Sequence, residues 1–303
     1  MNLKRLSPLI PVIMLPLGAY LGYRAFEAYS WSDIVAAVSA LPARNVALAF
    51  LFAACSYICL TGFDAMAVRY VGRSLPYPKI ALASFTSLSI GHNVGVAALS
   101  SGAVRYRFYS GWGLSAADVG KMILFCGLTV AVGLTTLGGL ALLIVPETAG
   151  RVTGLGTGLA TAVGAGCLLA VAGYVVLAWR VRRPLRFRGH ELGLPEPRLA
   201  IAQVGIGTVN FGCVAAVLHQ LLAGTVGYLE TVAIYVLSSV AALLSHVPGG
   251  LGVIEYVIAS SVPRGSVAGA LIGFRIVYFF VPLLIGATVL AISEIVRWRQ
   301  QAA

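Results

Sequence analysis

The sequence is poor in charged residues, which make up only 10% of its 303 residues. A soluble domain carries about 25% charged residues, so this chain has too little polar surface to cover itself in water. The shortage of charge excludes an ordinary soluble enzyme. It also excludes a nucleic-acid-binding domain, although the formal net charge is +11.

Familiar motifs for nucleotide or metal chemistry are also absent from the sequence. It has neither a G-x-x-x-x-G-K-[ST] phosphate loop nor an H-E-x-x-H metal motif. The five cysteines all lie within apolar stretches, where a thiol packs in a core more often than it binds a metal. We therefore expect no cofactor, no metal site and no catalytic residue. A membrane enzyme built from residues far apart in the chain stays open.

What the chain has instead is long apolar stretches. Backbone inside a bilayer must satisfy its own hydrogen bonds, so stretches long enough to cross about 30 Å of hydrocarbon are predicted to be helices. The first one follows Lys4 and Arg5 as in a signal peptide, but it lacks a small-x-small cleavage site, so we expect an uncleaved span. The six predicted spans are 8–26, 46–70, 119–145, 157–179, 199–222 and 267–293.

Two further apolar segments are interrupted. Segment 80–104 contains His92 and Asn93 among glycines, and segment 231–262 contains His246 in front of a helix-breaking run. Proline and glycine oppose helix continuation, so each segment is predicted to be a re-entrant hairpin. The helix-breaking run consists of Pro248, Gly249, Gly250 and Gly252.

Basic residues predict the orientation, because they concentrate in cytoplasmic loops. If the two hairpins enter from opposite sides, most of the 21 lysines and arginines fall on one side, and both termini are cytoplasmic. A basic loop at 180–198 separates halves of about 1–179 and 199–303. The prediction is an all-α integral membrane protein. Residues 1–303 form a single polytopic domain, with about six full transmembrane helices plus two re-entrant helical hairpins.

The two interrupted segments are weakly similar to each other. Residues 102–106 read GAVRY and residues 252–256 read GVIEY, with the charge reversed. This similarity suggests an inverted repeat. In such repeats, broken helices form the substrate site near the middle of the membrane.

Ionisable residues inside a membrane are costly, which makes them candidates for function. We expect Glu255 and Arg275 to pair, while Asp64 either pairs with Arg105 or lies at the interface. Such pairs fit helix docking, and they equally fit a polar path that binds a phosphate through arginine. The candidate path residues are Asp64, His92, Asn93, Arg105, Tyr106, Arg107, His246, Glu255, Arg275 and Tyr278.

The residues around these charges resemble a known family. The resemblance rests on SGAVRYR at 101–107 with YSGWGLS at 109–115, on PGGLGVIE at 248–255, and on Arg275-x-x-Tyr278-x-x-x-Pro282. These motifs are similar to those of the lysylphosphatidylglycerol synthase transmembrane family, and the resemblance extends over nearly the whole chain. It implies re-entrant helices around a lipid cavity in a bacterial cytoplasmic (inner) membrane.

The resemblance implies a flippase for anionic or aminoacylated phospholipids of the phosphatidylglycerol type. The sequence contains no soluble transferase domain, so no aminoacylation chemistry is carried over. Either a separate lipid synthase supplies the substrate, or the chain handles another lipid, or it is one domain of a longer protein. An accessory subunit of a lipid-modifying enzyme and a small-solute transporter remain alternatives. A homodimer also stays open.

Overall fold

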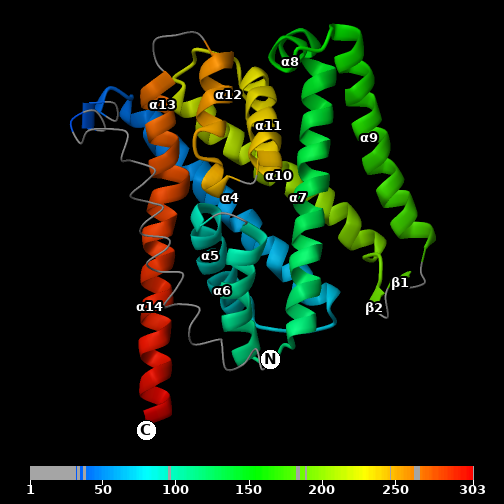
Figure 1. Ribbon diagram of the computed structural model, residues 1–303, viewed down its shortest axis with the longest axis vertical. Coiled ribbons are helices and arrows are strands. Elements are labelled where there is room, and N and C mark those ends of the chain that lie inside the picture. The colour runs from blue at the N-terminus through cyan, green and yellow to red at the C-terminus, as the bar shows by residue number, and fades with distance from the viewer. Residues whose placement is uncertain are drawn as a thin grey trace.

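The computed structural model describes residues 32, 35–36, 39–94, 97–181, 185–187, 190–245, 247–262 and 267–302 (Figure 1). The predicted first span at 8–26 and the candidate residue His246 lie outside these residues. The described part is almost entirely helical. Its helices are α4 (Ala43–Tyr70), α5 (Tyr77–Val94), α6 (Ala97–Gly111), α7 (Ala116–Ile144), α8 (Pro146–Thr153), α9 (Thr157–Arg180), α10 (Pro197–Leu221), α11 (Tyr228–Ser245), α12 (Val253–Ser261), α13 (Val267–Phe274) and α14 (Val281–Ala302).

Two short irregular helices interrupt this pattern. A 3-10 turn covers Pro248–Gly250, and a π-helix covers Arg275–Phe280 between α13 and α14. The predicted loop at 180–198 contains a small departure from an all-α fold, because β1 (Leu185–Phe187) and β2 (His190–Leu192) pair there as antiparallel strands.

Six helices are long and apolar enough to cross a membrane: 43–70, 116–144, 157–180, 197–221, 228–245 and 267–299. The predicted spans from 46–70 to 267–293 fall on these helices. The sixth of these helices is α11. The sequence analysis placed its residues in an interrupted segment, but the helix is long and apolar enough to be a candidate membrane span. The protein is therefore a multi-pass helical membrane protein.

The interrupted segments form two helical hairpins at opposite ends of the molecule. In Figure 1, α5 and α6 lie side by side in the lower half, and α11 and α12 lie side by side in the upper half. Their turns meet near the middle, because a Cβ atom built on Gly249 would lie 3.5 Å from the carbonyl oxygen of His92. The two hairpin tips are thus in contact. Their relation to a bilayer stays a prediction.

Local sequence signals explain where the long helix α7 begins and ends. The Ser115 hydroxyl accepts a hydrogen bond from the backbone N–H of Asp118, and the Asp118 carboxylate accepts one from the backbone N–H of Ser115. This capping box satisfies two amide groups that the helix start would otherwise leave unpaired. Pro146 follows the helix and begins α8, since proline is well suited to the first turn of a helix.

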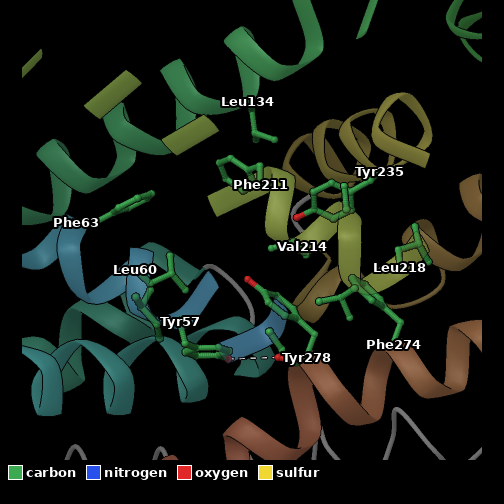
Figure 2. Close-up of a cluster of buried hydrophobic side chains, with 14 of the residues drawn as sticks. Tyr57, Leu60, Phe63, Leu134, Phe211, Val214, Leu218, Tyr235, Phe274 and Tyr278 are labelled. Atoms are coloured by element: carbon green, nitrogen blue, oxygen red, sulfur yellow. Dashed lines mark hydrogen bonds between the residues drawn. The ribbon is translucent and has the colours of Figure 1, made fainter. Parts of the chain in front are cut away.

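The centre of the molecule is built on α10, which packs against α4 and α7. Figure 2 shows the core cluster there, with side chains from α4, α7, α10, α11, α13 and the π-helix facing one another. The helices α7 and α10 cross at glycine. A Cβ atom on Gly207 would lie 2.8 Å from the carbonyl oxygen of Thr129, and one on Gly133 would lie 2.6 Å from the carbonyl carbon of Gly207. Small residues let helix backbones approach this closely in membranes.

We predict that Gly207→Ala lowers the free energy of unfolding by about 1–3 kcal/mol, because the added methyl group overlaps the backbone of α7. The matched control is Gly205→Ala on the same helix, where an added Cβ would meet no atom within 4 Å. Equilibrium unfolding in mixed detergent micelles measures both variants. Equal stabilities for the two variants would contradict a glycine-dependent crossing.

Candidate functional site

The first buried charge cluster joins α4, α6 and α7. The Nη2 atom of Arg105 lies 2.7 Å from Oδ1 of Asp64, and its Nε donates to both carboxylate oxygens at 3.1 Å. Arg105 is 3% exposed and Asp64 is fully buried. The open question about Asp64 is therefore answered, because it pairs with Arg105.

Neighbouring side chains complete this cluster. The Tyr109 hydroxyl donates to Oδ2 of Asp64 at 3.1 Å, the Cys126 thiol donates to Oδ1 at 3.5 Å, and Nη1 of Arg105 donates to the Ser101 hydroxyl at 3.1 Å. A buried ion pair is tolerable only when its remaining donors and acceptors are also bonded. The cluster meets this condition, and it fastens the α5–α6 hairpin to α4.

The second buried cluster holds the tip of the other hairpin. The Nε atom of Arg275 donates to Oε1 of Glu255 at 2.5 Å, and its Nη1 and Nη2 donate to the carbonyl oxygens of Gly249 at 2.6 Å and Gly250 at 3.2 Å. The guanidinium also lies 4.7 Å from the ring centroid of Phe279, a cation–π distance. Arg275 is 6% exposed. The predicted Glu255–Arg275 pair is confirmed.

The glycines of the helix-breaking run have a backbone reason to be there. Gly249, Gly250 and Gly252 have φ values of 61°, 61° and 78°, in the left-handed region that favours glycine. This turn aims two carbonyl oxygens at Arg275. Glu255 then restarts the helix, because its Oε2 accepts a hydrogen bond from the backbone N–H of Gly252 at 2.9 Å.

The π-helix next to Arg275 gives its carbonyl groups partners on other helices. The Tyr57 hydroxyl on α4 donates to the carbonyl oxygen of Tyr278 at 3.3 Å, the contact drawn in Figure 2. The Asn93 amide at the tip of α5 donates to the carbonyl oxygen of Phe279 at 3.2 Å. Short π-helical turns occur frequently at functional sites. No feature of the sequence predicted the π-helix at Arg275–Phe280.

Aromatic and polar side chains surround the point where the hairpin tips meet. The ring of His92 stacks on that of Tyr278 with centroids 6.2 Å apart, and its buried Nδ1 has no hydrogen-bond partner in the described part of the chain. The Ser56 hydroxyl donates to Oδ1 of Asn210 at 2.8 Å and lies 3.1 Å from the Tyr278 hydroxyl. Neither Ser56 nor Asn210 was among the path residues predicted from the sequence. Asn210 could have been recognised, because a side-chain amide within the predicted span 199–222 needs a polar partner.

The remaining candidates lie elsewhere. Arg107 was predicted beside the other path residues, but it lies toward the far end of α6, where its Nη2 is 2.5 Å from Oε2 of Glu294 on α14. Tyr106 is half-buried and packs against the hydrophobic core. Within the described residues, the structure brings His92, Asn93, Glu255, Arg275 and Tyr278 together. No group of three or more His, Cys, Asp or Glu side chains in that part is placed to hold a metal.

We predict that Arg105→Gln lowers the free energy of unfolding by about 3–5 kcal/mol, because it leaves the Asp64 carboxylate buried without its cation. The matched control is Arg73→Gln. Arg73 pairs with Asp118 at the surface, where an ion pair contributes about 0–1 kcal/mol. The double variant Arg105→Gln with Asp64→Asn is expected to regain part of the loss. Unfolding measurements in detergent check all three, and equal effects of both arginine changes would refute the structural role of the buried pair.

Comparison with known sequences shows which proteins are related to this chain. No family model matches the chain. The uncharacterized protein slr0712 of Synechocystis sp. is 31% identical over 279 residues, which cover 90% of this chain and 87% of that protein. The inner membrane protein YbhN of Escherichia coli is 28% identical over 247 residues, which cover 76% of this chain and 74% of YbhN. The chain therefore belongs to the same family of membrane proteins as slr0712, with YbhN as a further homologue.

Proposed function

We propose that the protein is a translocase that moves phospholipids with an anionic or aminoacylated head group across a bacterial inner membrane. The observation that carries this proposal is the contact between two hairpin tips from opposite ends of the molecule, held by the buried Arg275–Glu255 pair. Broken helices that meet at mid-depth are the usual construction of a transporter substrate site. Catalysis is not part of the proposal.

In this proposal, both hairpins are re-entrant and enter from opposite faces of the bilayer. The lower side of the molecule in Figure 1, where α14 ends and the loops after α4, α6 and α9 lie, contains many basic residues. Basic residues favour the cytoplasm, so this side is assigned to it, together with the end of α14. The cytoplasmic N-terminus stays a prediction from the sequence. The basic residues on this side include Arg73, Lys79, Arg180, Arg198, Arg297 and Arg299.

The inverted repeat is supported by how the two halves use their charges. Arg105 and Glu255 occupy matching places in the GAVRY and GVIEY segments, each on the second helix of its hairpin. Arg105 pairs with the buried Asp64 on another helix, and the half-buried Glu255 pairs with the buried Arg275 on another helix. An ion pair therefore fastens each hairpin, with the cation on the first hairpin and the carboxylate on the second.

A phosphate head group suits Arg275 in particular. Its guanidinium donates to the carbonyl oxygens of Gly249 and Gly250, and the same planar fork can donate two parallel hydrogen bonds to a phosphate. A lipid could therefore replace the hairpin tip as the partner of Arg275, and the displaced tip would open the path. The sequence resemblance supports an aminoacylated phosphatidylglycerol as substrate, supplied by a separate synthase. The sequence contains no G-x-x-x-x-G-K-[ST] motif, and movement would use a gradient, a membrane potential or downhill scrambling.

A second candidate function follows from the same contacts. The donors of Arg105 and Arg275 are occupied by protein groups, as in pairs that only dock helices. This occupancy also suits an accessory subunit of a lipid-modifying enzyme, in which the pairs would only hold helices together. The two candidates differ in whether the isolated protein moves lipid.

We predict that the purified protein in proteoliposomes translocates labelled phosphatidylglycerol or its lysyl ester. Glu255→Gln and Arg275→Ala are each expected to slow the movement at least about tenfold, the effect of losing one hydrogen bond to a charged group. Arg275→Lys keeps the charge without the planar fork, and we expect an intermediate rate with an unchanged fold. The matched control is Arg151→Ala, an exposed arginine on α8.

Thermal unfolding of each variant separates loss of function from loss of structure. Failure of the folded native protein to move either lipid would reject the translocase and favour the accessory subunit. Full activity of a folded Arg275→Ala variant would reject the assignment of the site.

A further inference from the structure

A third charge cluster lies away from the hairpin tips, where the end of α6 meets α14. Arg107 pairs with Glu294 there, and Nη1 of Arg297 donates to the carbonyl oxygen of Arg107 at 3.2 Å. All three side chains are half-buried. The proposed translocation path does not use this cluster, which lies on the basic side of the molecule in Figure 1.

Two polar atoms of this cluster lack a hydrogen-bond partner among the described residues. Nε of Arg107 and Oε1 of Glu294 are both buried, and neither has a hydrogen-bond partner in the part of the chain that the structure describes. A buried polar atom without a partner costs about 1–3 kcal/mol, and more when it is charged. One of these atoms is a donor and the other an acceptor. They would be satisfied together by a ligand that offers both an oxygen acceptor and a hydrogen-bond donor.

Cations and aromatic rings extend the cluster. The guanidinium of Arg297 lies 5.6 Å from the ring centroid of Phe108, and the ammonium of Lys79 lies 5.8 Å from that of Trp112. The Phe108 and Trp112 rings are themselves 5.8 Å apart. Lys79, Arg107 and Arg297 outnumber the one carboxylate of Glu294, so the cluster favours an anion.

The backbone of α6 leaves room for this arrangement. A Cβ atom on Gly111 would lie 3.3 Å from Nη2 of Arg297, so glycine lets the guanidinium lie along the end of the helix. Nearby on α14, Ile295 and Trp298 are exposed apolar side chains, with Trp298 67% exposed. Charged groups beside exposed apolar and aromatic side chains are typical of the bilayer interface. These neighbours suit a lipid with acyl chains better than a soluble phosphate.

We propose that this cluster binds one phospholipid whose head group carries both a phosphate and a primary ammonium. On binding, the half-buried side chains of Arg107 and Glu294 turn toward the head group. The phosphate then accepts hydrogen bonds from Nε of Arg107 and from Arg297, and the ammonium donates to Oε1 of Glu294. The site is separate from Arg275, and it holds lipid whether or not the protein translocates any. Charge-assisted hydrogen bonds of this kind are the strong ones.

The choice of lipids makes the test specific. Phosphatidylethanolamine has a phosphate and an ammonium with N–H donors, whereas phosphatidylcholine has the same charges but no N–H donor. We predict that the purified full chain binds phosphatidylethanolamine about tenfold more tightly than phosphatidylcholine, the effect of one hydrogen bond to a charged group. Native mass spectrometry with both lipids measures the two dissociation constants. Phosphoethanolamine without acyl chains is expected not to bind.

Variants assign the preference to its residues. Glu294→Gln is expected to abolish the preference for phosphatidylethanolamine, and Arg297→Gln to weaken binding of both lipids about tenfold. Arg297→Lys, which keeps the charge, is the second variant if Arg297→Gln does not fold. The matched control Arg151→Gln lies at the opposite end of the molecule and is expected to bind as the native protein does.

Three outcomes would overturn the inference. Equal affinity of the native protein for both lipids would remove the role of the ammonium. An unchanged preference for phosphatidylethanolamine in folded Glu294→Gln would show that Glu294 does not bind the ammonium. Binding of phosphoethanolamine as strong as that of the lipid would identify a soluble-ligand site. None of these results bears on Arg275, so the translocase proposal is tested separately.

Discussion

A charge inside a hydrocarbon layer must find its partners within the protein, and this constraint shapes the central part of the fold. Arg105 meets it with Asp64 and Ser101, and Arg275 meets it with Glu255 and two backbone carbonyl groups. Removing one member of such a pair costs about 3–5 kcal/mol, because the other charge stays buried. The pairs therefore fix the positions of the segments that carry them. Each pair fastens one hairpin to a helix outside it, and the two fastened hairpins meet at their tips.

This arrangement ties stability to motion. A hairpin can leave its place only if its ion pair breaks or exchanges partners, so the pairs set the free energy of any opening. The two pairs differ in the groups that complete them. The Asp64–Arg105 cluster is closed by side chains of Tyr109, Ser101 and Cys126. Arg275 instead depends on the carbonyl oxygens of a glycine turn, which moves with the hairpin tip. The second hairpin is thus the one that a competing ligand could release.

The sequence predicted the parts of the structure that depend on composition. Long apolar runs indicated the spans, because no other backbone structure suits them in a bilayer, and the Pro248–Gly252 run indicated a break. The Glu255–Arg275 pair followed from the cost of isolated charges. The π-helix at Arg275–Phe280 was not predictable, since its residues are ordinary for a helix and only tertiary contacts explain the wider turn. The Gly133–Gly207 crossing was also hidden, because many of the 35 glycines face open space. The Arg107–Glu294 pair was not predictable either, since it depends on where α6 ends relative to α14.

The full occupancy of Arg275 is compatible with a binding role. Unpaired donors are costly for a guanidinium as deeply buried as that of Arg275, because each one loses hydration without a replacement. An occupied resting state is therefore expected of a transport site at this depth, provided that the internal partner can be displaced. The carbonyl oxygens of Gly249 and Gly250 are suitable temporary partners, because these two residues carry no side chains that must be repacked. A phosphate that replaces them leaves two carbonyl groups to be satisfied, and these must reach water or the lipid head group. In the proposed translocase, opening of the path and hydration of the hairpin tip would therefore be one event.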